Sequence, residues 1–155
     1  GGASGWLGHA WSSMDSEREM NRLFQATQGG DFGDEPRKII VQVSTANPTR
    51  LKSALDETEN LLENSRREHR QLQVEVVANG SGADLLRADV TPYADRIGLL
   101  MARYPNLNLM ICNQTLAKLR DQGVEVQLLP NTGITPSAAQ QIRKRLLQGW
   151  DYVRV

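Results

Sequence analysis

The sequence predicts a three-layer α/β fold around a mainly parallel, five-stranded sheet. From residue 38 onward, five short apolar segments alternate with longer amphipathic segments. Because consecutive parallel strands need crossover connections, this alternation favours a sheet with helices on both faces. The amphipathic segments also carry helix-start signals, in which a capping residue precedes proline: Asn47-Pro48, Thr91-Pro92 and Thr135-Pro136.

The first strand and the helix that follows it show the clearest pattern. Residues 38–44 (KIIVQVS) form a mostly β-branched run, which is typical of a strand covered on both faces. Asn47 and Pro48 suit the N-cap and the first position of a helix. The apolar side chains of this helix recur at spacings of three and four and form one stripe: Leu51, Ala54, Leu55, Thr58, Leu61 and Leu62.

The middle of the chain repeats the same order of elements. Residues 72–78 (LQVEVVA) predict the second strand, and residues 79–82 (NGSG) predict a tight turn. One helical turn is expected over residues 83–87. The helix opened by Thr91-Pro92 ends near Pro105, and its apolar face consists of Tyr93, Ile97, Leu100 and Tyr104.

The third strand ends at the only cysteine of the chain. Residues 107–112 are apolar enough for a buried strand, and Asn113 suits the N-cap of a helix over residues 114–122 that stops at Gly123. This places the Cys112 thiol next to a helix N-terminus.

The last part of the chain predicts two more strands and one helix. Residues 124–129 (VEVQLL) are expected to form the fourth strand, and residues 130–133 a loop. Thr135-Pro136 opens a helix that Gly149 ends, and residues 151–155 form the fifth strand. The inward face of this last helix is expected to consist of Ala139, Ile142 and Leu146.

Everything before this domain reads as an appendage. Residues 1–36 are expected to be a flexible N-terminal segment, which could in part be an expression tag or a processed end, with one candidate short helix at residues 15–28. Residues 37–155 form the α/β domain. The expected compartment is the cytoplasm, and the periplasm stays open if the N-terminus is a processed one.

Composition excludes several classes of function. The chain has 18 Lys and Arg against 18 Asp and Glu, so we expect no nucleic-acid partner, and no apolar run is long enough to suggest a membrane partner. A single cysteine excludes an internal disulfide and a cysteine-rich zinc site. The two histidines, His9 and His69, lack metal-ligand spacing to Cys112, so neither a metal nor another cofactor is expected.

Cys112 admits two interpretations. The free N–H groups and the dipole at a helix N-terminus favour an anion, so a thiolate of lowered pKa is plausible there. Alternatively, Cys112 is a small buried apolar residue. Because strand ends of a parallel sheet meet at one edge, Cys112 should lie near three other loops, residues 44–47, 79–82 and 130–133.

Other chemistries find little support. The NGSG turn lacks the third glycine of a dinucleotide-binding loop and the Gly-Lys-Ser/Thr of a P-loop. Neither histidine belongs to the edge that carries Cys112, so a Cys–His nucleophile is not expected. What remains is chemistry that needs a thiolate alone, namely thiol exchange or the carriage of a persulfide sulfur.

Four stretches together resemble the DsrE/DsrF-like family of small sulfur-relay and sulfur-oxidation proteins. These are KIIVQV in the first strand, VEVVANG with Leu85 and Leu86 after it, CNQTL at residues 112–116, and the C-terminal LLQGWDYVRV. The resemblance covers residues 38–155 and implies the DsrE-like version of the α/β fold. It also implies homotrimers or homohexamers, and sulfur donor and acceptor proteins as partners.

The resemblance assigns roles to individual residues. Cys112 matches the cysteine that accepts the persulfide sulfur, and Asn113 and Thr115 match the polar residues that follow it. Asn79 and Gly80 match a His-Gly or Asn-Gly pair in the substrate pocket. This chain departs from the family at Asn113-Gln114, where Gly-Asn is commoner. A second function class stays open, a non-catalytic oligomeric module that binds a small ligand or a protein, with Cys112 structural.

Overall fold

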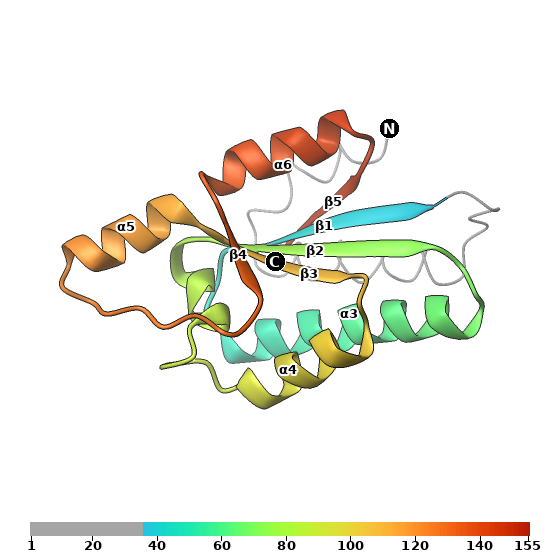
Figure 1. Ribbon diagram of the computed structural model, residues 1–155, viewed down its shortest axis with the longest axis horizontal. Helices are drawn as coiled ribbons and strands as arrows, with labels where there is room; N and C mark the ends of the chain where they lie inside the picture. Colours follow the sequence, from blue (N-terminus) through green and yellow to red (C-terminus); the bar gives the residue numbers. More distant parts are fainter. Residues whose placement is uncertain (1–35) are drawn as a thin grey trace.

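The computed structural model describes residues 36–155, which form one α/β domain (Figure 1). The expected flexible segment at residues 1–36 and its candidate helix at residues 15–28 lie outside the described residues, apart from Pro36. No described helix has the length and apolar character needed to cross a membrane.

The sheet has five parallel strands in the order β4-β3-β2-β1-β5. With helices on both faces, this confirms the predicted three-layer α/β fold (Figure 1). The chain moves outward from β1 to β4 and then returns to place β5 on the other side of β1. The strands are β1 (Arg37–Val43), β2 (Leu72–Ala78), β3 (Leu107–Cys112), β4 (Thr132–Thr135) and β5 (Asp151–Arg154).

One face of the sheet carries the larger apolar core. Helices α3 (Pro48–Arg67) and α4 (Ala94–Arg103) cover this face, and the short helix η1 (Gly80–Leu86) joins β2 to the segment before α4 (Figure 1). Alternate residues of the central strands point into this core, for example Val41, Val76 and Leu109, which are almost fully buried.

Helix α3 follows its sequence closely. The Asn47 side chain accepts a hydrogen bond from the Arg50 N–H at 3.1 Å, with Pro48 in the first turn, as the capping signal predicts. All six residues of the predicted apolar stripe are buried. Helix α4 starts later than its proline signal suggests, at Ala94, because the Thr91 hydroxyl accepts from the Tyr93 N–H at 3.2 Å and caps a turn instead.

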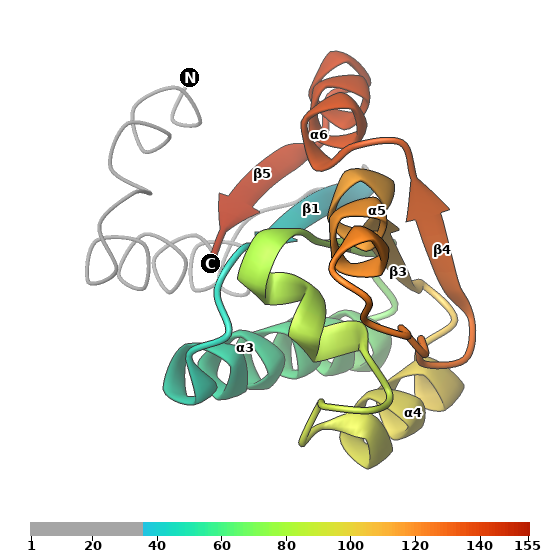
Figure 2. The same cartoon turned by 90° about the vertical axis from the view of Figure 1, so that its left-hand side faces the viewer.

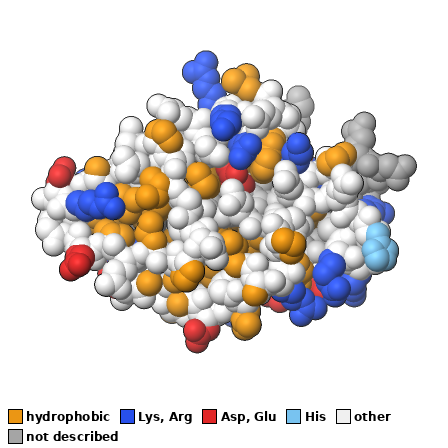
Figure 3. Space-filling view, viewed as in Figure 1, with side chains coloured by type: hydrophobic (Ala, Val, Ile, Leu, Met, Phe, Trp, Pro, Cys, Tyr) orange, Lys and Arg blue, Asp and Glu red, His pale blue; other side chains and the backbone are white. Residues whose placement is uncertain are grey.

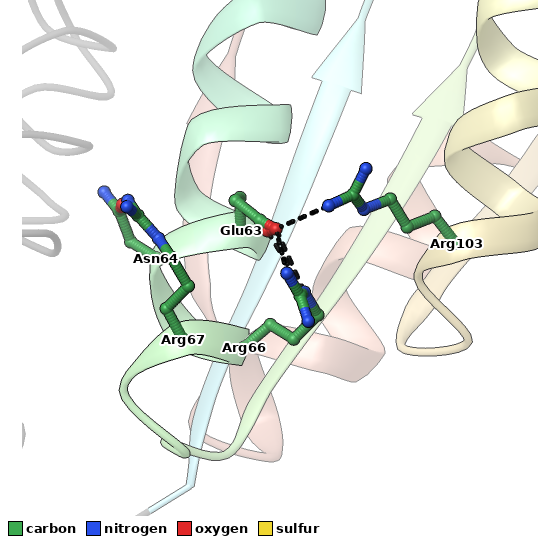
Figure 4. Close-up of polar contacts among 5 residues, drawn as sticks. All are labelled: Glu63, Asn64, Arg66, Arg67 and Arg103. Carbon is green, nitrogen blue, oxygen red and sulfur yellow. Dashed lines mark hydrogen bonds and ion pairs between the residues drawn. The ribbon is translucent and has the colours of Figure 1, made fainter.

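An ion cluster joins the C-terminal half of α3 to α4. The Glu63 carboxylate accepts from the Arg66 guanidinium at 2.6–3.1 Å and from the Arg103 guanidinium of α4 at 3.0 Å (Figure 4). Beside it, Arg67 donates to Asn64. The Arg66 hydrogen bond is the main cause that lowers the pKa of Glu63 to about 2. This cluster therefore ties the two helices that cover one face.

Helix α6 (Ala138–Leu147) covers the opposite face of the sheet. The side of α6 that packs on the sheet is not the predicted one. Ala139 and Leu146 are exposed and Ile142 is half-buried, whereas Gln141 is buried against the sheet. The reason is Glu75, a carboxylate in the middle of β2 that is only 1% exposed. A buried charge needs partners, so the polar side of α6 turns toward it.

Glu75 obtains these partners from α6 and β3. The Arg145 guanidinium donates to its carboxylate at 2.8 and 3.3 Å, Gln141 donates to it as well, and the Asn108 amide donates at 3.2 Å. Burial raises the pKa of Glu75, but these donors outweigh burial and leave it below its usual value. Arg145 also stacks on the Trp150 ring, 4.5 Å from its centroid.

The predicted fourth strand at residues 124–129 is wrong. These residues run over the core edge outside the sheet, with one antiparallel bridge between Arg87 and Leu128. Their alternating pattern arises because Val126 and Leu128 pack against the core while Glu125 and Gln127 are exposed. The edge strand is Thr132–Thr135, much of which was expected to be a loop. Gly133 lies so close to Met110 that an added Cβ would come within 2.6 Å of the sulfur.

Candidate functional site

A cleft of about 1160 Å³ opens at the edge where the strands end. Figure 2 faces this edge and shows α5 (Asn113–Asp121), α6 and η1 around it. The strand order reverses next to β1, and residues from the ends of β1 and β5 line the cleft: Gln42, Tyr152 and Arg154. Such reversal points at the carboxyl edge are where parallel sheets bind ligands.

Two helices form the walls of this cleft. Both contribute residues spaced three and four apart, which lie on one face of a helix. The residues from α5 are Thr115, Lys118 and Leu119, followed by its C-cap residue Gln122, and the main α6 residues are Ala138, Ala139, Ile142, Arg143 and Leu146. The apolar stripe of α6 that was expected to be core thus lines the cleft.

Cys112 lies where β3 ends and α5 begins. It is the N-cap residue of α5, it is 4% exposed, and it lines the cleft. The thiol is therefore largely covered by protein, and the cleft is a side from which a reactant can approach it.

Donors at two helix N-termini lower the pKa of the Cys112 thiol. Burial raises the pKa of the Cys112 thiol, but the N–H groups of Thr115, Ala138 and Gln114 and the Thr115 hydroxyl lower it, and the balance falls below the ordinary value. Ala138 is the first residue of α6, so the start of this helix faces the start of α5 across the sulfur. Each donor favours the thiolate over the thiol.

Thr115 links the sulfur to the turn after β2. Its hydroxyl accepts a hydrogen bond from the Gly80 N–H at 2.9 Å, and the same hydroxyl lowers the pKa of the Cys112 thiol. Gly80 has a φ of +55°, a conformation that glycine adopts without strain. The turn at residues 79–82 therefore has a direct geometric connection to the cysteine.

A second polar chain crosses the cleft from β5 to β2. The Tyr152 hydroxyl donates to the Gln42 side-chain oxygen, and the Gln42 amide donates to the Asn79 side-chain oxygen at 3.0 Å. Burial raises the pKa of Tyr152 despite the opposing charge of Arg154. Tyr152 therefore remains a neutral donor at physiological pH.

The structure brings four of the five predicted site residues to the cleft. Cys112, Asn79, Gly80 and Thr115 all line it. Asn113 is exposed and is not among the lining residues. Its predicted role as N-cap is also wrong by one residue, because α5 begins at Asn113 and no side chain caps it. The N–H groups of Gln114 and Thr115, in the first turn of α5, lower the pKa of the Cys112 thiol.

Sequence reasoning missed the residues that other strands and α6 supply. Gln42 had a signal, because it is the one polar residue within the apolar run of β1. Tyr152 and Arg154 could have been found from their place at the end of a strand. Ala138 had no signal, because it acts through its backbone N–H. The expected edge loops at residues 44–47 and 130–133 do not line the cleft.

Within residues 36–155, no cluster of three or more His, Cys, Asp or Glu side chains could hold a metal ion.

Comparison with known proteins gives a structural neighbour. No protein-family model matches the chain, and no curated protein matches it either. The chain is similar to a solved structure of MTH1491, a protein of unknown function from Methanobacterium thermoautotrophicum. The TM-score is 0.64 at 22% sequence identity, over 77% of this chain and 99% of the other. At that identity the likeness shows a shared fold.

Proposed function

We propose that this protein is a sulfur-relay protein that carries a sulfane sulfur as a persulfide on Cys112. One observation carries the proposal: the Cys112 sulfur lies against an open cleft while donors from α5 and α6 favour its thiolate. A thiolate is the form that attacks a sulfane sulfur, and a lowered pKa makes more of it available at neutral pH.

The transfer needs no electron from outside the reacting sulfurs. The Cys112 thiolate attacks the outer sulfur of a persulfide R–S–SH, a new S–S bond forms to Cys112, and the old S–S bond breaks. The proton stays on the transferred sulfur, and the donor leaves as the thiolate R–S⁻. Transfer to an acceptor thiolate runs through the same exchange in the opposite direction.

Within this proposal the neighbours of Cys112 have distinct roles. Thr115 stabilises the thiolate and orients the sulfur, and Gly80 orients Thr115 through its N–H. Asn79, held by Gln42, offers polar atoms to the bound sulfur compound. Asn113 receives no ligand contact, because it lies away from the cleft lining.

We further propose the oligomeric state, the partners and the compartment expected from the resemblance to the DsrE/DsrF-like family. The protein works as a homotrimer or homohexamer in the cytoplasm, or in the periplasm if its N-terminus is a processed one. It exchanges sulfur with donor and acceptor proteins and uses no cofactor. Exposed apolar side chains offer surface for such assembly, since Leu147 is 80% and Ile134 51% exposed. Light scattering during gel filtration would measure the subunit count, and a monomer would contradict this part.

Intact mass spectrometry tests the carrier role. The protein is incubated with inorganic polysulfide, separated from it and weighed, beside a Cys112→Ser variant. We expect a gain of one or more sulfur atoms that a reductant removes and that the variant lacks. A labile sulfur that the variant also gains would show binding elsewhere and would contradict the proposal.

The alternative is a binding module in which Cys112 only packs. Its support is the low exposure of the thiol, which is 4%. Alkylation of the native protein separates the two functions. If the thiol reacts with iodoacetamide only after denaturation, and no sulfur is gained from polysulfide, Cys112 is structural and the binding module is the better description.

A further inference from the structure

The cleft beside Cys112 is more basic than the protein as a whole. The chain carries equal numbers of acidic and basic residues, yet Lys118, Arg143 and Arg154 line the cleft against a single carboxylate, Asp84. Figure 3 shows Lys and Arg side chains gathered over the part of the surface where α6 lies. A concave site with this excess attracts negatively charged ligands.

Two of these cations are not used in holding the fold together. The ion pairs among residues 36–155 involve other basic residues, and neither Lys118 nor Arg143 takes part in them. Both side chains are exposed, one from each wall of the cleft. Their charges are thus available to a ligand without the loss of a structural contact.

Apolar side chains line the cleft beside these charges. Leu119, Ile142 and Leu146 line the cleft, and Leu146 is 37% exposed to solvent. Lys118 lies about 4.5 Å beyond Thr115 along the axis of α5, and Arg143 about 7.5 Å beyond Ala138 along α6, at 1.5 Å per residue. Helices α5 and α6 start at the sulfur and run away from it in opposite directions (Figure 1), so a ligand at the sulfur has aliphatic surface beside it and one of the two cations on either side.

We propose that, beside the donor proteins, this cleft admits a small sulfur donor, a low-molecular-mass persulfide with a negative charge at the end remote from its sulfur. This inference rests on the proposed function and names the substrate class of the same site. The outer sulfur of the donor faces Cys112, and the remote charge is attracted by Lys118 on one side of the sulfur and by Arg143 on the other. The exchange then proceeds as above, with the donor leaving as its thiolate.

A set of three small persulfides that differ in charge tests the proposal. The persulfides of N-acetylcysteine, 2-mercaptoethanol and cysteamine carry an anionic carboxylate, a neutral hydroxyl and a cationic ammonium group at the end remote from the sulfur, and transfer to Cys112 is followed by rapid quench and intact mass. We expect the anionic donor to react fastest and the cationic donor slowest. The order should flatten as salt is added, because exposed charges are screened.

Matched variants separate the cleft from the net charge of the protein. Lys118→Gln with Arg143→Gln removes the two cleft cations, and Arg120→Gln with Lys144→Gln removes two exposed cations of the same helices outside the cleft lining. We expect the first pair to lower the rate with the anionic donor by roughly tenfold, since each exposed charge contact is worth about twofold to fivefold. The neutral donor should react as before with both pairs. Equal rates for the three donors, or an equal loss in both variant pairs, would overturn the proposal.

An unreactive ligand keeps this inference distinct from sulfur transfer itself. S-methyl-N-acetylcysteine and its uncharged methyl ester are each added before alkylation of Cys112 by iodoacetamide. Selective protection by the anionic form, lost in the Lys118→Gln and Arg143→Gln variant, supports the anion-binding cleft. If such protection occurs while no donor transfers sulfur, the carrier function fails and the ligand class stands. If neither compound protects Cys112, the proposed ligand class is wrong.

Discussion

The backbone N–H of Gly80 donates to the side-chain hydroxyl of Thr115 at 2.9 Å, across 35 positions of the chain. A hydroxyl has one proton to donate, and with Gly80 occupying an acceptor position that proton stays available to favour the Cys112 thiolate, whose pKa the Thr115 hydroxyl lowers. A turn after β2 thereby sets the orientation of a donor on α5. The turn therefore affects the pKa of Cys112 indirectly, through Thr115.

Removal of the Thr115 hydroxyl should make Cys112 a weaker acid. Thr115→Val keeps the shape of the side chain but loses the donor, so the pKa of Cys112 rises and alkylation at neutral pH slows. The pH dependence of the iodoacetamide rate measures this pKa. Thr115→Ser retains the hydroxyl and should stay close to the wild type. A Thr115→Val variant with an unchanged pH profile would show that the hydroxyl does not act on the sulfur.

Gly82 should tolerate no side chain. A Cβ built there would lie 2.0 Å from the Val43 carbonyl oxygen, so Gly82→Ala must displace backbone at the end of β1. We expect a loss of about 1–3 kcal/mol in the free energy of unfolding, as for other overpacked sites. By contrast, a Cβ added at Gly98, in α4, would meet no atom within 4 Å.

Gly98→Ala is the matched control for that change. Because alanine favours a helix over glycine, it should raise the free energy of unfolding by about 0.5–1 kcal/mol. Urea denaturation of both variants gives the two values. Equal effects at the two positions would contradict the close approach of Gly82 to β1.

Neutralising Glu75 should loosen α6. Glu75→Gln removes the charge that Arg145 pairs with inside the protein, and we expect a loss of roughly 1–3 kcal/mol, moderated because Arg145 can still reach water. Since the pKa of Glu75 is lowered by folding, its contribution is present above the unfolded value and fades as the pH falls through the lower native value. Urea midpoints at neutral and acid pH measure both effects.

The exposed Glu125 provides the control for charge loss alone, because it takes part in no ion pair among the described residues. Glu125→Gln should change the urea midpoint little. If Glu75→Gln behaves like Glu125→Gln, then the buried contacts with α6 do not stabilise the fold.

The Glu63 cluster should make the α3–α4 contact sensitive to acid. Folding lowers the pKa of Glu63 from about 4.5 to about 2, so its stabilising effect is complete above pH 4.5 and is lost as the pH falls toward 2. Glu63→Gln should therefore differ from the wild type at neutral pH and converge with it near pH 2. Thermal unfolding across this range is the measurement, and a constant difference would exclude the cluster as the cause.

The sequence shows which helices carry an apolar stripe, but it does not show whether that stripe packs on the sheet or lines the cleft. Helix α3 was predicted correctly because its stripe packs on one sheet face, and burial is the commonest fate of such a stripe. Helix α6 carries a similar stripe, but Glu75 in β2 requires its polar side, and the apolar side is left to the cleft. A carboxylate within the run LQVEVVA was the signal that a polar helix face would pack on this strand.

The candidate site was predictable where strand ends bring residues together. Asn79, Gly80, Cys112 and Thr115 follow from the parallel sheet, because neighbouring strands deliver their loops to one edge. The Ala138 N–H could not be found, since a backbone donor leaves no trace in the residue type. The strand at residues 132–135 was missed because TGIT has a weaker alternation than VEVQLL, and position at the sheet edge decided between them.

The hydrophobic positions of this chain are of two kinds, those in the core and those of α6 that line the cleft. Leu61 and Ile111 are fully buried, so a polar substitution at either position would lower the stability of the fold. Leu146 lines the cleft and is exposed, so a change there leaves the core intact, whereas Ile142 lines the cleft and also packs against the apolar cluster around Ile40. A relative that keeps the fold and the cysteine but carries a charge at Leu146 would therefore offer its ligand a different cleft.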